Sequence, residues 1–159
     1  MDWVLRQISS GKLPPYAGLF NCASDSCPLV KDGLSWLHNE WMKLRPTCKV
    51  AGAMVGGNRT GPHGNHINGD CTLFSADREF LFWLCKRAGD CIRSGGGHDW
   101  ILAPEFEARG WADIPGIRSD WKRKTFPESD WAGYTGSGIK WLHGVKDLSL
   151  IKLARARLI

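Results

Sequence analysis

Residues 48–74 read CKVAGAMVGGNRTGPHGNHINGDCTLF, and this stretch sets the centre of the fold. Its first part, Cys48 to Val55, is apolar and ends at a glycine pair, which predicts a buried strand. A loop rich in glycine and asparagine follows, and Cys71 to Phe74 predicts a second, short strand. Such a loop keeps its shape only when the rest of a domain packs around it, and the flanking sequence predicts that domain.

Amphipathic helices are predicted on both sides of this stretch. Before it, apolar residues recur with the spacing of one helix face: Val30, Leu34, Leu37, Trp41 and Leu44. Pro46 ends that helix. After the second strand, Ser75 predicts the cap of another helix over residues 76–89, with Gly89 as its stop.

The remaining segments complete an α+β domain. Local patterns predict a helix over 2–9, a strand over 98–102, a helical turn over 104–110, a strand over 139–143 and a helix over 146–158 with Leu148 inward. Residues 16–29 read as a loop, which a Cys22–Cys27 disulfide would clip, and residues 111–139 have no clear pattern. We expect a single domain with a small antiparallel sheet flanked by helices, made of an N-terminal arm and loop (1–29) and a core (30–159).

Composition limits the partners. The 159 residues carry a net charge of +5, which favours polyanions such as nucleic acid, acidic lipid or an anionic cell wall. Nucleic acid is allowed by the charge but not favoured, because the basic residues are dispersed. The nine tryptophans suit stacking on glycan rings, although core packing is the commoner role of tryptophan.

Targeting signals and cysteines leave the compartment open. No run approaches the roughly 18 apolar residues of a membrane span, and the first residues, MDWVLRQISSGKLPP, lack the pattern of a secretion signal. The six cysteines suit three disulfides in an extracellular or cell-wall-facing protein, or free thiols in the cytoplasm.

A phosphate-binding loop is excluded. Gly56 and Gly61 have the right spacing after a strand, but Pro62 stands where lysine is needed to reach the terminal phosphates. His63 stands where a hydroxyl would hold magnesium. We therefore exclude nucleotide hydrolysis.

Two other chemistries are open at this loop. His63, His66 and Asp70 lie close together, and imidazole with carboxylate is a common zinc set; the alternative is a surface loop that carries them without function. Cys71 with His98 as its base would suit thiolate chemistry, although a structural role is commoner for one cysteine among six.

The same stretch resembles the M15 peptidases, which include D-Ala-D-Ala carboxypeptidases and phage L-alanyl-D-glutamate endolysins. In that family a helix and a strand lead to a segment like SGYRT, then a loop, then H-x-x-G-x-A-x-D. This chain has VGGNRT at 55–60 and HINGDCTLF at 66–74 in the same order. The resemblance implies a zinc enzyme in which His66 is the first ligand, Arg59 binds a substrate carboxylate and Cys71 is the small residue.

The chain departs from this pattern at two functional positions. Leu73 stands where the family has its second ligand, an aspartate. His143, in Trp141-Leu142-His143, suits the third ligand, but Lys140 stands where the family has an acidic base. The resemblance then requires substitutes: Asp70 or His63 as the missing ligand, and Asp130, Glu128 or Asp99 as the base.

Three functional hypotheses follow. The first is a zinc-dependent, peptidase-like domain that acts on bacterial cell-wall peptide or glycan, with metal ligands among His66, Asp70, His143 and His63, and with Asp130 or Asp99 as the catalytic base. The second is a non-catalytic binding or interaction protein on the same fold, which Leu73 favours. The third is a cysteine peptidase or amidase that uses Cys71 and His98.

Overall fold

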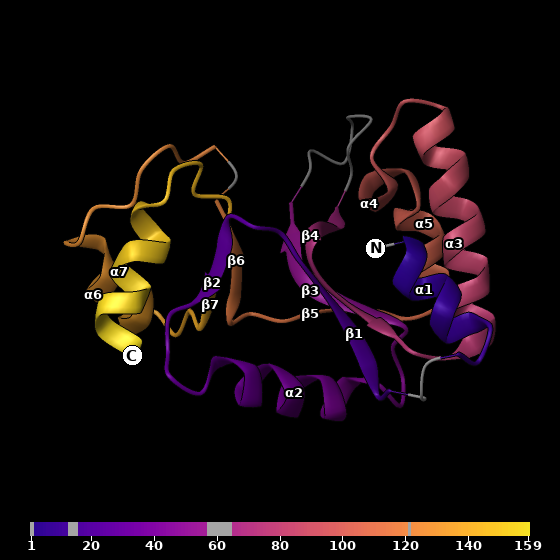
Figure 1. Ribbon diagram of the computed structural model, residues 1–159, viewed down its shortest axis with the longest axis horizontal. Coiled ribbons are helices and arrows are strands. Elements are labelled where there is room, and N and C mark those ends of the chain that lie inside the picture. Colours follow the sequence, from indigo (N-terminus) through magenta and orange to yellow (C-terminus); the bar gives the residue numbers. More distant parts are fainter. Residues whose placement is uncertain (1, 13–15, 57–64, 121) are drawn as a thin grey trace.

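The computed structural model describes residues 2–12, 16–56, 65–120 and 122–159 (Figure 1). The helices are α1 (Asp2–Ser9), α2 (Gly33–Leu44), α3 (Arg78–Arg93), α4 (His98–Ile101), α5 (Ala103–Ala108), α6 (Asp130–Gly136) and α7 (Ser149–Leu158). The strands are β1 (Gly18–Cys22), β2 (Ser26–Pro28), β3 (Val50–Val55), β4 (His66–Ser75), β5 (Trp111–Asp113), β6 (Ile117–Ser119) and β7 (Trp141–His143). The predicted α+β class is confirmed.

The strands form two small sheets rather than one. A four-stranded sheet has the order β1-β4-β3-β5, and a three-stranded sheet has the order β2-β7-β6. Each sheet contains one parallel pair, β3 with β5 and β6 with β7, so both are mixed where a wholly antiparallel sheet was expected. In Figure 1, α1, α3, α4 and α5 lie beside the larger sheet, and α6 and α7 lie beyond the smaller one.

Strand β4 carries a large bulge at the centre of the larger sheet. Gly52 of β3 pairs with Thr72, whereas Met54 pairs with Ile67, so residues 68–71 lie opposite Ala53 alone. A Cβ on Gly52 would lie 2.6 Å from the carbonyl oxygen of Cys71, which explains why glycine occupies this position. Bulges redirect side chains out of the regular alternation, and this one contains Asp70.

Three hydrophobic clusters hold the layers together. One lies between the larger sheet and α3 and includes Val50, Phe74 and Leu84. A second packs α6 and α7 on the smaller sheet. The third joins both sheets to α2 and contains Trp41, Cys71, Leu73, Ile117 and Trp141. Because this third cluster spans both sheets, it fixes the position of β4 relative to β7.

Several local predictions need correction. Helix α3 begins after Asp77, whose carboxylate accepts a hydrogen bond from Phe80 N at 2.8 Å, and it runs through Gly89 to Arg93. Residues 98–101 form a helix, not a strand, and residues 16–29 contain β1 and β2. Leu34 and Leu148, expected inside, are 67% and 61% exposed.

Two further findings concern the cysteines and the helices. All six cysteines are free thiols, so the Cys22–Cys27 disulfide is not formed. Within the described part of the chain, none of the helices has the length and apolar character needed to cross a bilayer.

Candidate functional site

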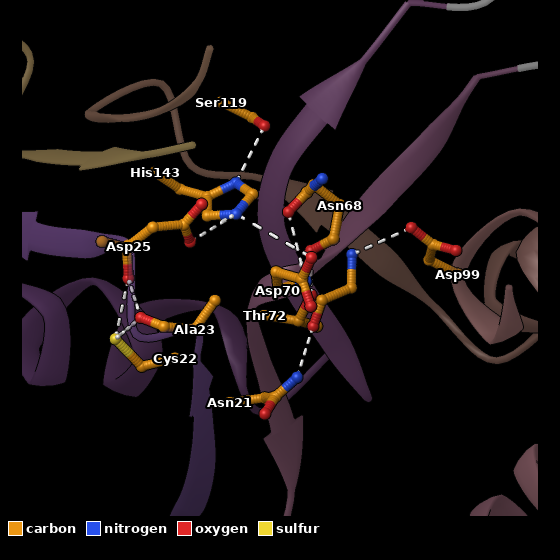
Figure 2. A network of polar contacts seen from close by, with 12 residues as sticks. Asn21, Cys22, Ala23, Asp25, Asn68, Asp70, Thr72, Asp99, Ser119 and His143 are labelled. Atoms are coloured by element: carbon orange, nitrogen blue, oxygen red, sulfur yellow. Dashed lines mark hydrogen bonds and ion pairs between the residues drawn. The ribbon is translucent and has the colours of Figure 1, made fainter. Parts of the chain in front are cut away.

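The candidate site is centred on His143, at the end of the central strand of the smaller sheet. His143 pairs with Ser26 of β2 on one side and with Ser119 of β6 on the other. Its side chain is only 2% exposed. Nδ1 lies 3.0 Å from Ser119 Oγ, and Nε2 lies 3.3 Å from Asp25 Oδ1 and 3.8 Å from Asp70 Oδ2 (Figure 2). One buried imidazole therefore meets side chains from three other segments of the chain.

Asp25 reaches His143 from the short connection between β1 and β2. Its backbone oxygen accepts a hydrogen bond from Gly144 N at 3.2 Å, and Lys146 Nζ lies 2.7 Å from its other carboxylate oxygen. Burial acts to raise the pKa of Asp25, but the Lys146 hydrogen bond and the nearby positive charge outweigh it and hold the pKa below its ordinary value. Asp25 is therefore ionised at neutral pH.

Asp70 reaches the same nitrogen from the bulge in β4. Its backbone N–H donates to Asn68 Oδ1 at 3.1 Å, and its carbonyl accepts from Ala23 N at 2.9 Å. The Thr72 hydroxyl donates to the carbonyl of Asn68, which closes the bulge on itself. The backbone is thus fixed from both sides, while the Asp70 side chain remains 63% exposed.

His143 is neutral at neutral pH despite these two carboxylates. Burial lowers the pKa of His143 below its ordinary value of 6.5, and the charges of Asp25 and Asp70, which act to raise it, do not overcome burial. A neutral imidazole has one N–H and one lone pair, so it can serve as a metal ligand or as a general base.

The partners of His143 define two tautomers with different chemistry. With the proton on Nδ1, Ser119 accepts a hydrogen bond and the Nε2 lone pair faces two carboxylates, an arrangement that is favourable only with a cation between them. With the proton on Nε2, Asp25 accepts a hydrogen bond and Ser119 donates its hydroxyl proton to Nδ1. The first tautomer suits a metal ligand, and the second suits a proton relay to a serine.

A cavity of about 380 Å³ adjoins the site. Ser119 lines it, together with Met54, Ile117, Arg118 and Asp120. Arg118 is 56% exposed, and its Nε lies 3.1 Å from Asp120 Oδ1, so the guanidinium is anchored at one edge. The cavity therefore offers a cationic group beside the serine that contacts His143.

The structure brings two of the four predicted metal ligands together. Asp70 and His143 are in contact, as described above. His66 is partly buried at the start of β4, opposite Val55, and four residues of strand place it up to about 13 Å from Asp70. His63, like the predicted substrate-binding Arg59, lies outside the described residues.

The predicted acids have other partners. Asp99 Oδ2 accepts a hydrogen bond from Gly69 N at 3.2 Å, so this carboxylate supports the bulge beside Asp70. Asp130 pairs with Arg123 at the start of α6, and Glu128 lies 2.6 Å from Arg157 Nη2. Asp99 thus lies next to the candidate site, while Asp130 and Glu128 form ion pairs at and just before the start of α6.

The Cys71–His98 pair is placed unfavourably for thiolate chemistry. Cys71 is fully buried, and burial raises the pKa of its thiol well above the ordinary value. His98 lies against Gly69 instead, where a Cβ would come within 3.1 Å of Nε2. Among the described residues, His98 Nε2 has no hydrogen-bond partner although it is buried.

Metal donor groups lie at His143, but they do not form a complete coordination site. Within residues 2–12, 16–56, 65–120 and 122–159, no three His, Cys, Asp or Glu side chains form a ready-made metal-binding group. Figure 2 shows Asp25 and Asp70 approaching the imidazole from different sides. The donor types fit zinc, and the Asp70 oxygen, 3.8 Å from Nε2, lies beyond the spacing of ligands in a closed zinc site.

Sequence reasoning missed Asp25, Ser119 and Lys146. Asp25 lies in a segment assigned to a loop, and Ser119 lies in a stretch without a clear pattern. The strands that carry or flank these residues have only three residues each, too few to show a period of two. One signal for strand β2 was available in the sequence. Cys27 and Leu29 are alternate apolar residues, as in a half-buried strand, and both are buried.

No protein-family model matches the chain, and no curated protein or solved structure is significantly similar to it.

Proposed function

We propose that the protein is a zinc-dependent, peptidase-like hydrolase that acts on bacterial cell-wall peptide, with His143, Asp70 and Asp25 as the metal-binding groups. The contact between His143 and two carboxylates, 3.3 and 3.8 Å from one imidazole nitrogen, carries this proposal. The order of elements is a second support: α2, β3, β4 and α3 follow one another as the resemblance to M15 peptidases implies, and β7 ends in His143.

The donor chemistry at His143 suits zinc. Zinc is held in proteins by imidazole nitrogen and carboxylate oxygen at about 2.0–2.2 Å, and tetrahedral ligands are then about 3.3–3.5 Å apart. The Nε2 to Oδ1 distance of 3.3 Å to Asp25 already has this value. Asp70 is further away, but its exposed side chain can turn without disturbing the core. Bound zinc would supply a Lewis acid and an activated water.

The surrounding residues have defined roles in this proposal. Ser119 Oγ accepts a hydrogen bond from Nδ1–H of His143, which leaves the Nε2 lone pair for the metal. Lys146 holds Asp25 in position through the 2.7 Å contact. Asp99 and Asn68 fix the bulge so that Asp70 points at the imidazole.

The proposed substrate is an anionic peptide. The net charge of +5 favours an anionic wall, and Arg118 offers a guanidinium in the cavity lined by Ser119. A peptide carboxylate held there would lie beside Ser119, which contacts Nδ1 of His143; the metal-binding groups lie at the other ring nitrogen. This role is analogous to the role that the family resemblance assigns to Arg59.

Zinc titration by calorimetry tests the proposal. The wild-type chain should bind one zinc, and His143→Ala and Asp70→Asn should each lower the affinity at least tenfold. His38→Ala, an exposed histidine of α2, is the matched control and should bind as wild type does. If both site variants bind zinc as tightly as the wild type, the proposal is rejected. The protein is then a non-catalytic binding protein.

A serine hydrolase is the second candidate, because Ser119 contacts His143 and lines the cavity. In this candidate His143 takes the hydroxyl proton of Ser119 while Asp25 stabilises the imidazolium that forms. The two candidates predict opposite results with Ser119→Ala and a chelator. A zinc enzyme should lose activity with the chelator, and its Ser119→Ala variant should keep a weakened metal site. A serine enzyme should be unaffected by the chelator, and its Ser119→Ala variant should lose all activity.

A further inference from the structure

Cys22 and Cys71 occupy directly opposite positions on β1 and β4. Ala23 N donates to Asp70 O at 2.9 Å, so the pair one residue further along is the hydrogen-bonded one. Cys22 and Cys71 therefore form a non-hydrogen-bonded pair, in which the Cα atoms are about 4.5 Å apart and the side chains share a face. This separation lies within the range that a disulfide spans.

The two thiols differ in access. Cys71 is fully buried in the cluster between the sheets, whereas Cys22 is exposed at the end of β1, with its Sγ 2.9 Å from Ser26 Oγ. A reagent in solvent can reach Cys22, and rotation of that side chain turns its sulfur toward Cys71.

We propose that Cys22 and Cys71 are a redox-active pair that forms a reversible cross-strand disulfide at the edge of the His143 site. Cys22 lies three residues before Asp25, and Cys71 directly follows Asp70. A bond between them would join the two segments that bring the carboxylates to His143. The pair therefore braces the site when it is oxidised.

The oxidant is a small disulfide such as oxidised glutathione. The Cys22 thiolate attacks one glutathione sulfur, which forms a mixed disulfide and releases one glutathione thiol. The Cys71 sulfur then attacks the Cys22 sulfur and gives up its thiol proton as it does so, which forms the Cys22–Cys71 bond and releases the second glutathione. Two electrons pass from the cysteine pair to the glutathione disulfide, and the two cysteine protons end on the two released thiols.

Peptide mapping of the full chain tests the proposal. The protein is incubated with oxidised glutathione at pH 8, and its remaining thiols are alkylated in denaturant. The masses of its tryptic peptides are then measured by mass spectrometry without reduction. Trypsin leaves Cys22 and Cys27 on one peptide, residues 13–31, and Cys71 on residues 60–78. These two peptides should appear joined, and the joined species should persist in Cys27→Ala and disappear in Cys22→Ser.

Thermal unfolding gives a second, independent reading. The oxidised wild type should unfold roughly 5–15 °C above the reduced form, and Cys22→Ser should show no such rise. A link that survives Cys22→Ser, or a Cys22 that keeps glutathione while Cys71 is fully alkylated, would overturn the proposal. Both readouts are independent of zinc and of hydrolysis, so they stand or fall apart from the proposed function.

Discussion

The buried, neutral His143 predicts a specific pH dependence of stability. The folded-state pKa of His143 is lowered by burial, so the unfolded chain takes up a proton near pH 6.5 that the folded chain does not. The contribution of His143 to stability is fully present above pH 6.5. It falls as the pH decreases below that value, until the folded-state pKa is reached. This is the direction opposite to that of a histidine stabilised by an ion pair.

The size of the effect follows from one proton. The free energy of unfolding should fall with a slope that approaches, and does not exceed, about 1.4 kcal/mol per pH unit below pH 6.5. Because His143 is 2% exposed, solvent screening does little to narrow the gap between its folded and unfolded pKa, which sets the width of the pH window. This slope occurs at higher pH than the effect of Asp25 on stability. The Asp25 carboxyl has an ordinary pKa of 3.8, and its pKa is lowered further in the folded chain.

Urea unfolding followed by tryptophan fluorescence measures this slope between pH 5 and 7.5. His143→Gln replaces the imidazole by a neutral amide of similar reach that does not titrate. The slope of this variant in the same pH window should therefore be shallower than that of the wild type. His38→Gln, on the exposed face of α2, is the control and should keep the wild-type slope. Equal slopes in wild type and His143→Gln would refute the placement of His143 as a buried neutral base.

Three further predictions test the fold and its thiols. Gly110→Ala should cost about 1–3 kcal/mol of unfolding free energy, because φ is 86° and the new Cβ would lie 2.4 Å from the Thr47 carbonyl oxygen; Gly136→Ala, with open space around it, should cost little, and equal costs would contradict this packing. Leu84→Ala should cost about 2–5 kcal/mol, because Leu84 is 2% exposed, whereas Leu34→Ala, at a position that is 67% exposed, should stay within about 0.5 kcal/mol; urea unfolding checks both. Brief alkylation of the native protein at pH 8 should label Cys22 first and leave Cys27 unlabelled, because burial raises the pKa of Cys27 to about 12; labelling of Cys27 first would contradict the burial of β2.

The central elements of the fold could be predicted because their patterns are long. The helix before the central stretch has a repeated apolar face, and its Leu37 and Trp41 are buried as expected. Strand β3 is apolar throughout and lies in the larger sheet. Strands β5, β6 and β7 have three residues each, so tertiary pairing rather than local propensity defines them.

The candidate site could be predicted only in part. The family resemblance puts Asp70 and His143 in one proposed ligand set with His66 and His63, and in the structure Asp70 lies 3.8 Å from His143. Asp25 could not be inferred, because its distance from His143 depends on the pairing of β2 with β7. The roles of Asp130 and Glu128 could not be inferred either, because Asp130 pairs with Arg123 and Glu128 pairs with Arg157 of α7, and no local pattern signals such pairs.

The most direct test of the account is hydrolysis of purified cell-wall peptide by the zinc-loaded chain, measured as new amino groups. The prediction is release that stops on chelation, returns when zinc is restored, and is lost in Asp70→Asn and His143→Ala but kept in His38→Ala. Release that is unaffected by chelation, or no release from a chain shown to hold zinc, would contradict it.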